Sequence, residues 1–88
     1  MMKIGFYATG SGTASYEDLL DQIQYAEASG FDSVWLRERH FHLDHQGRNF
    51  FSSPFVAAAY IAAKTKRIRI GMACRILPLD HPIHIAED

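Results

Sequence analysis

The sequence has little cysteine, no long apolar run and no excess of either charge. Cys74 is the single cysteine, so the chain cannot form an internal disulfide, which suits a reducing compartment. No stretch approaches the ~20 apolar residues of a membrane-spanning helix, and the N-terminus lacks a signal-peptide pattern. Nine basic residues balance ten acidic ones, whereas nucleic-acid and anionic-membrane partners favour clustered Lys and Arg. We expect a cytoplasmic protein with neither partner.

Strand-like and helix-like segments alternate along the chain. Residues 3–8, 32–36 and 68–74 are short and apolar, with the β-branched and aromatic residues typical of buried strands. Between the first two, apolar residues in 16–26 follow the i, i+3, i+4, i+7 pattern of an amphipathic helix. Residues 55–63 are apolar almost all round, which predicts a helix packed between neighbours.

The expected helix ends carry recognisable signals. Ser15 is placed to cap the first helix, with Asp18 three residues on, and Gly30 is placed to end it. Ser53 followed by Pro54 predicts the start of the second helix, because proline suits the first helical position.

The resulting β-α-β-α-β order, with strands roughly 30 to 35 residues apart, predicts parallel strands joined by helical crossovers. Three parallel strands alone expose two edges, and the apolar second helix needs more partners than the chain supplies. Pro82 opens a further helix close to Asp88. We therefore expect a single α/β domain, of which residues 1–88 are an incomplete N-terminal part.

Ligands of such folds gather at the carboxyl ends of the strands, and polar residues follow all three predicted strands. They are Thr9, Ser11 and Thr13; Glu38, Arg39, His40, His42, Asp44, His45 and Arg48; and Arg75, Asp80 and His81. The Gly10-x-Gly12 pair is a weak dinucleotide signal, because the third glycine of that fingerprint is replaced by Ser15. A flexible loop is the better interpretation.

His40, His42 and Asp44 are residue types that bind metals, and alternate residues of an extended segment can share one side. A metal-dependent hydrolase is therefore one alternative, although no second ligand cluster is visible and we predict no metal site. His40 directly follows a strand, so it is either a general acid or base or the structural partner of Glu38.

The third strand contains small residues. If Ile70 and Met72 face the helices, Gly71 and Ala73 face the other side and leave room for a planar ring. Small residues that merely fit a crowded interior are the alternative. Cys74 is either a buried, inert thiol or a nucleophile, and the former is favoured.

Several segments in the same order resemble the luciferase-like, flavin-dependent monooxygenases of bacteria, over nearly the whole chain. They are residues 31–36 (FDSVWL), 38–41 (ERHF), 53–59 (SPFVAAA), 70–74 (IGMAC), 77–82 (LPLDHP) and 86–88 (AED).

The resemblance implies a (β/α)8 TIM barrel cut after its third strand, with FMN, or in some relatives a deazaflavin, at the strand carboxyl ends. Reduced FMN and dioxygen would oxygenate a small organic substrate, and a separate flavin reductase would supply the reduced flavin. By position, Ala73 and Cys74 match an unusual cis peptide beneath the flavin ring, with Gly71 nearby, while Glu38 and His40 match residues at the mouth.

One position departs from the luciferase pattern. Luciferases have two adjacent histidines after the glutamate, and here the first is Arg39. A non-luminescent relative is therefore expected. Since the family's phosphate-binding residues come mostly from later strands, we expect the 88 residues alone to be inactive. The remaining alternative is a non-catalytic fragment that forms homo-oligomers or docks to a partner.

Overall fold

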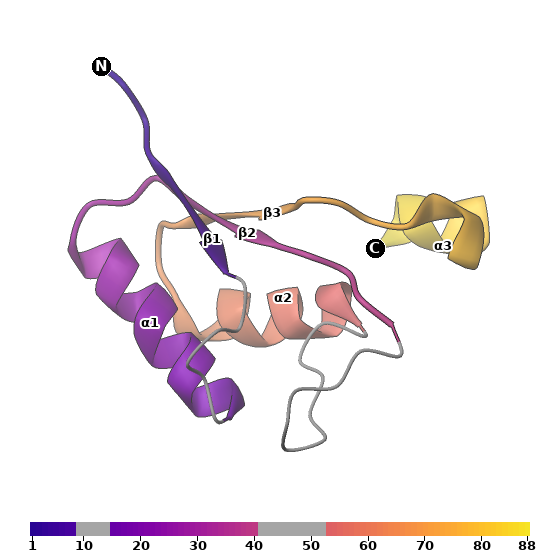
Figure 1. Cartoon of the computed structure of the whole chain (residues 1–88), viewed down its shortest axis with the longest axis horizontal. Coiled ribbons are helices and arrows are strands. Elements are labelled where there is room, and N and C mark those ends of the chain that lie inside the picture. The colour runs from indigo at the N-terminus through magenta and orange to yellow at the C-terminus, as the bar shows by residue number, and fades with distance from the viewer. Residues whose placement is uncertain (9–14, 41–52) are drawn as a thin grey trace.

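The computed structural model describes residues 1–8, 15–40 and 53–88. Three strands alternate with helices in the predicted order, followed by a short 3-10 turn and a final helix (Figure 1). The elements are β1 (Gly5–Ala8), α1 (Tyr16–Ala28), β2 (Ser33–Leu36), α2 (Pro54–Lys64), β3 (Arg69–Met72), the turn Leu77–Leu79 and α3 (Pro82–Glu87). Each strand is shorter than its predicted range, because the outermost residues of that range are not part of the strand pairing.

The three strands form one parallel sheet in the order β1-β2-β3. Tyr7, Trp35 and Gly71 lie side by side across it. Both connecting helices, α1 and α2, lie on the same face of the sheet (Figure 1). A sequential strand order with helices on one face is the winding of a β/α barrel, whereas doubly wound sheets reverse their order and carry helices on both faces. The predicted parallel α/β arrangement is confirmed.

The signals at the helix ends act as predicted, with one difference. The Ser15 hydroxyl accepts a hydrogen bond from the Asp18 N–H at 3.1 Å, so α1 is capped by its side chain. Gly30, just past the end of α1, has a φ of +92°, which favours glycine. Ser53 occupies the N-cap position of α2 but makes no side-chain cap hydrogen bond, and the fixed φ of Pro54 suits the helix start.

The core lies between the helices and the face of the sheet they cover. Its centre is formed by Ile23, Val34, Leu36 and Ile61, all at most 1% exposed. Ile70 packs against this cluster, as the alternation of the third strand predicted. No helix in the described part of the chain is long and apolar enough to cross a membrane.

The opposite face of the sheet is open. Tyr7 and Trp35 point to this side and are 47% and 42% exposed. The indole of Trp35 lies across the sheet between two glycines. A Cβ added at Gly5 would meet its Nε1 atom at 2.8 Å, and one added at Gly71 would meet its six-membered ring at 2.6 Å. Glycine at both positions thus lets the indole lie flat on the backbone.

The end of α1 is tied to the start of β3 through Glu27. Its carboxylate accepts hydrogen bonds from the backbone N–H groups of Lys66, Arg67 and Ile68. These bonds, those from Arg67 and Ile68 foremost, lower the pKa of Glu27. The basic residues Lys64, Lys66, Arg67 and Arg69 around these bonds are exposed, and Glu27 fixes the backbone of residues 66–68.

The second helix is less enclosed than its composition predicted. Pro54, Ala57 and Ile61 are buried, but Val56 is 65% exposed. In this structure α2 contacts the sheet on one side and α1 on another, and its remaining side faces solvent.

Candidate functional site

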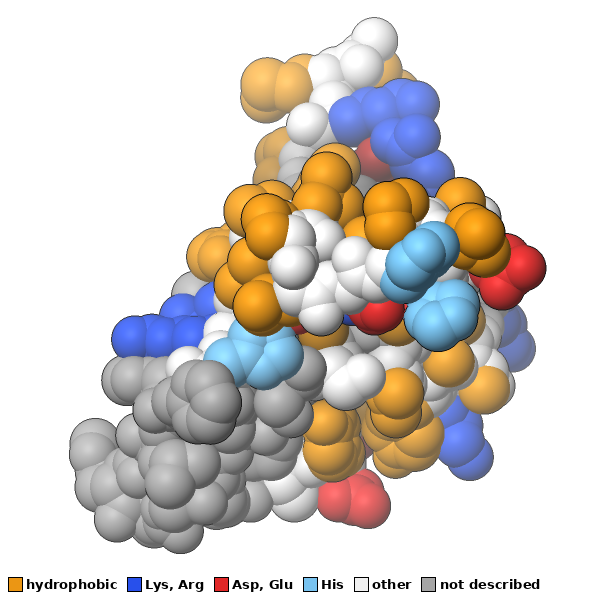
Figure 2. Space-filling view, turned by 90° about the vertical axis from the view of Figure 1, so that its right-hand side faces the viewer, with side chains coloured by type: hydrophobic (Ala, Val, Ile, Leu, Met, Phe, Trp, Pro, Cys, Tyr) orange, Lys and Arg blue, Asp and Glu red, His pale blue; other side chains and the backbone are white. Residues whose placement is uncertain are grey.

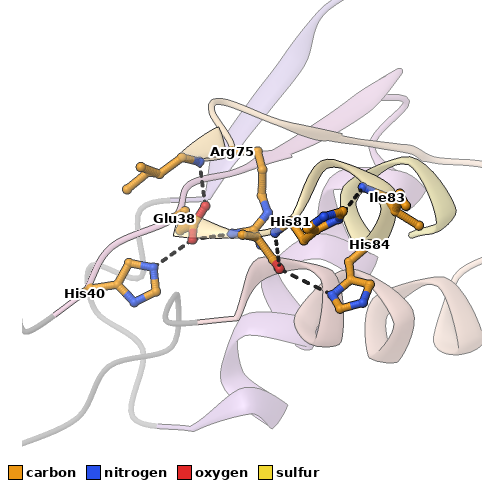
Figure 3. Close-up of polar contacts among 8 residues, drawn as sticks. Glu38, His40, Arg75, His81, Ile83 and His84 are labelled. Carbon is orange, nitrogen blue, oxygen red and sulfur yellow. Dashed lines mark hydrogen bonds and ion pairs between the residues drawn. The ribbon is translucent and has the colours of Figure 1, made fainter. Parts of the chain in front are cut away.

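The polar residues after β2 and β3 meet at one end of the sheet. Because the two strands are parallel neighbours, their carboxyl ends bring Glu38, His40 and Arg75 together (Figure 3). Glu38 lies between the other two, with its side chain only 1% exposed. The site therefore joins residues nearly 40 positions apart in the sequence.

Glu38 is a multiple acceptor. Its Oε1 atom lies 2.7 Å from Nε2 of His40 and also accepts a hydrogen bond from Nη1 of Arg75. Its Oε2 atom accepts from the backbone N–H of Ile76 at 2.6 Å. Both carboxylate oxygens are satisfied, so a buried charge is supported by three donors.

These donors determine the charge of Glu38. Burial by itself would raise its pKa, but the hydrogen bonds from Arg75, the Ile76 N–H and His40 together outweigh burial. They lower the pKa of Glu38 from 4.5 to about 2. The carboxyl group is therefore ionised at neutral pH, which makes it an acceptor and not a proton donor.

Arg75 is held from several directions. Its Nη2 atom donates to Oδ2 of Asp80 at 2.8 Å, and its guanidinium lies 5.2 Å from the ring centre of Phe55. Glu38, foremost through its side-chain hydrogen bond, raises the pKa of Arg75. Asp80 in turn accepts from the His81 N–H at 2.8 Å, which is the main reason that its pKa is lowered.

A cleft of about 450 Å³ opens beside this network. It lies between the start of α2, the segment after β2 and the segment after β3, and it is lined by Glu38, His40, Ser53, Pro54, Phe55, Val56, Ala59, Arg75, Leu79, Asp80 and Asp88. Figure 2 shows histidine and exposed hydrophobic side chains gathered at this end of the molecule. Leu77, Leu79 and Ile83 are each 59% exposed there.

The segment that follows β3 has two small, exposed residues, Ala73 and Cys74. The peptide bond between them is cis, as the resemblance implied. The hydroxyl of Tyr7 donates to the carbonyl oxygen of Ala73 at 3.3 Å, which links β1 to this segment. The favoured interpretation of Cys74 as a buried thiol is wrong, because its side chain is exposed.

The structure brings together only some of the residues that the sequence singled out. Glu38 and His40 form the carboxylate–histidine pair that was one of the two interpretations of His40, and Ala73 and Cys74 follow the neighbouring strand at the same end of the sheet. The space over Gly71, expected to be open for a ring, is taken by Trp35. The candidates in the first loop, with His42, Asp44, His45 and Arg48, lie outside the described residues.

Sequence reasoning missed the roles of two residues. Arg75 was recognised only as a polar residue after the third strand, and Trp35 only as part of the second strand. A signal for Arg75 was present, because a cation following one parallel strand and an anion following its neighbour meet at the same edge. No sequence signal indicated that Trp35 would cover Gly71.

No three metal-binding side chains gather into one site within residues 1–8, 15–40 and 53–88. His42 and Asp44, on which the hydrolase alternative depends, are not among these residues. Glu38 contacts His40, but its other side-chain partner is Arg75, which is not a metal ligand.

The parallel sheet, the helices on one face and the polar site at the carboxyl ends together describe a β/α fold that places its ligand site at the carboxyl ends of the strands. The family model of the luciferase-like monooxygenases matches residues 2–88. The chain therefore belongs to the luciferase-like monooxygenase family.

Individual relatives agree with this assignment. The chain is 41% identical over 63 residues to an alkanal monooxygenase alpha chain of Photorhabdus laumondii, covering 72% of this chain and 16% of the relative. It is 32% identical over 75 residues to the oxygenase component of a flavin-dependent trigonelline monooxygenase of Acinetobacter baylyi, covering 83% and 19%. A limonene 1,2-monooxygenase of Rhodococcus erythropolis is 31% identical over 74 residues, covering 84% and 18%. The chain thus spans less than a fifth of the length of these relatives.

Proposed function

We propose that residues 1–88 form the first three strand-and-loop units of a (β/α)8 barrel and contribute part of the mouth of a flavin-dependent monooxygenase. The enzyme would use reduced FMN and dioxygen to oxygenate a small organic substrate. The observation that carries this proposal is the meeting of Glu38, His40 and the Ala73–Cys74 segment at the carboxyl ends of parallel strands, where ligands of β/α folds bind.

The open face of the sheet supports the barrel. Helices cover one face, and the other carries Tyr7, Trp35 and two glycines. In a closed barrel the face without helices becomes the packed interior. Aromatic side chains exposed here would then be covered by the strands that close the barrel.

The residues at the carboxyl end fit a flat ring at one position and not at another. Ala73 and Cys74 are small and exposed, so a ring can approach their backbone. Over Gly71 the Trp35 indole already occupies the space. We therefore assign the contact with the flavin ring to Ala73 and Cys74. Gly71 would contribute indirectly, by leaving room for the indole of Trp35. Reduced FMN would supply two electrons to dioxygen, whereas a reduced deazaflavin would transfer a hydride instead.

His40 and Glu38 would act on the substrate side. His40 is 31% exposed and lines the cleft, so its ring can contact a bound molecule, while Glu38 fixes it from behind. Apolar residues of the cleft, Phe55 and Leu79 among them, suit the carbon skeleton of a small organic substrate. Arg39 in place of the first histidine supports a non-luminescent enzyme.

The partner that we propose is a separate flavin reductase, which would supply the reduced flavin. The trigonelline relative is described as an oxygenase component, which supports a two-component system. A cytoplasmic location and a homo-oligomer stay predictions. A well-folded 10 kDa monomer in size-exclusion chromatography would count against oligomerisation and against a non-catalytic fragment that needs a partner.

An anaerobic titration with reduced FMN tests the proposal. We expect tight binding by a chain extended to eight strands and weak binding by residues 1–88, because most phosphate contacts of the family come from later strands. Ala73→Leu in the extended chain should weaken binding by about tenfold or more, since a branched side chain displaces the ring. Ala28→Leu, at an exposed position of α1, is the matched control. Equal affinity of both variants would contradict the placement of the ring.

A further inference from the structure

The carboxylate of Glu38 dictates which nitrogen of His40 carries a proton. Glu38 is almost fully buried, its Oε2 atom is engaged by the Ile76 N–H, and Arg75 donates to its Oε1 atom. An ionised carboxylate can only accept hydrogen bonds. The 2.7 Å contact between Oε1 and Nε2 of His40 therefore requires the proton to be on Nε2.

A neutral imidazole with a proton on Nε2 carries its lone pair on Nδ1. The 31% exposure of the His40 side chain and its position on the cleft give that ring access to a bound molecule. Nδ1 is then the nitrogen able to accept a proton or a hydrogen bond from a ligand, while Nε2 is committed to Glu38.

The proton position on His40 depends on how the carboxylate of Glu38 is oriented, and Arg75 fixes that orientation. The guanidinium donates to Glu38 through Nη1 and to Asp80 through Nη2, and it lies over the ring of Phe55. A planar fork held at two carboxylates and an aromatic ring can adopt few orientations. Glu38 is consequently presented to His40 in one rotamer.

We propose that Arg75 is a positioning residue, which acts through Glu38 to hold His40 with its proton on Nε2 and its lone pair on Nδ1. This rests on the proposed role of His40 at the mouth of the site. Arg75 itself need not contact substrate or flavin.

Nitrogen NMR of the full 88-residue chain reads the proton position directly. A long-range ¹H–¹⁵N correlation at about pH 8.5, above the ordinary titration range of imidazole, distinguishes a protonated from an unprotonated ring nitrogen. We expect His40 to show a protonated Nε2 and a bare Nδ1, with the other tautomer absent. The urea-unfolded chain, in which both tautomers exchange, is the reference. A protonated Nδ1 in the folded chain overturns the proposal.

Three substitutions test the part played by Arg75. Arg75→Met removes both donors, and the ratio of the two His40 tautomers should fall on the order of tenfold towards that of the unfolded chain. Arg75→Lys keeps the charge but cannot bridge Glu38 and Asp80, so it should give an intermediate ratio. Asp80→Asn releases one arm of Arg75 and should shift the ratio in the same direction, which keeps the test decisive should Arg75→Met not fold.

The matched control is Arg69→Met, which removes a similar arginine–carboxylate pair, with Asp32, at the other end of the sheet. A merely structural role for Arg75 would lower stability in both variants without changing the tautomers of His40. Wild-type tautomers in the folded Arg75 and Asp80 variants would overturn the proposal. Because the measurement needs no flavin or substrate, its failure is distinguishable from failure of the proposed function, which the FMN titration tests.

Discussion

The two faces of the sheet are built from alternate residues of the same three strands, yet they differ in almost every respect. One face packs Val34, Leu36 and Ile70 against α1 and α2. The other presents Tyr7 and Trp35 to solvent. The covered face packs against helices that follow β1 and β2 directly in the chain, so its packing partners come from nearby sequence. The open face has no such partner within the described residues, which is why its burial depends on other parts of a barrel.

The largest effect should come from the covered face. Leu36 is fully buried, so Leu36→Ala leaves a cavity and should lower the free energy of unfolding by about 3 kcal/mol. Urea denaturation followed by circular dichroism measures the loss. Tyr7→Ala, a truncation on the open face, should cost less than about 1 kcal/mol. Equal losses from the two variants would show that the open face is packed in solution.

The carboxyl end, where both faces meet, should show a pH-dependent effect. Glu38→Gln leaves Arg75 without its buried anion and should cost on the order of 2 kcal/mol at pH 7. Since the pKa of Glu38 is lowered from 4.5 to about 2, its stabilisation is complete above about pH 4.5 and is lost as the pH falls towards 2. The difference between wild type and variant should shrink across that window.

Urea denaturation at several pH values provides the measurement. Glu17→Gln, at an exposed position in the first turn of α1, is the control and should stay within about 0.5 kcal/mol of wild type throughout. A gap between wild type and Glu38→Gln that stays constant from pH 5 to 2 would contradict an ionised, buried Glu38.

The packing of Trp35 on the open face should matter less than Leu36 in the core or Glu38 at the carboxyl end. A Cβ at Gly71 collides with the indole, but the ring is 42% exposed and can swing outwards. Gly71→Ala should therefore cost only about 1 kcal/mol, with a red shift in the fluorescence of this single tryptophan. Gly30→Ala introduces strain at a positive φ with nothing within 4 Å, so it should destabilise without changing the emission. An unshifted spectrum in Gly71→Ala would mean that Trp35 does not cover Gly71.

Much of the fold could be predicted because its signals are local. Ser15, Gly30 and Pro54 mark helix ends through their own backbone and side-chain chemistry, and the alternation of Ile70 and Met72 with small residues assigned the covered face of β3. The order of elements then required parallel pairing. The extent of burial could not be predicted in the same way, because the exposure of Val56 and of Cys74 depends on what the rest of the molecule places beside them.

The candidate site was predictable only in part. Glu38 and His40 lie two residues apart in one extended segment, so their contact is almost local. The contact of Arg75 with Glu38 spans 37 residues, and that of Tyr7 with Ala73 spans 66. Side-chain contacts of this kind depend on strand register and rotamer, which the pattern of residue types does not specify.

By itself, the sequence determined the secondary structure, the parallel order and the family, since caps, periodicity and segment motifs are all encoded in neighbouring residues. Only the tertiary structure decided that Arg75 and His40 share one oxygen of Glu38 and that Trp35 fills the space over Gly71. These contacts join separate strands, and the distances between them follow from how the sheet pairs and twists.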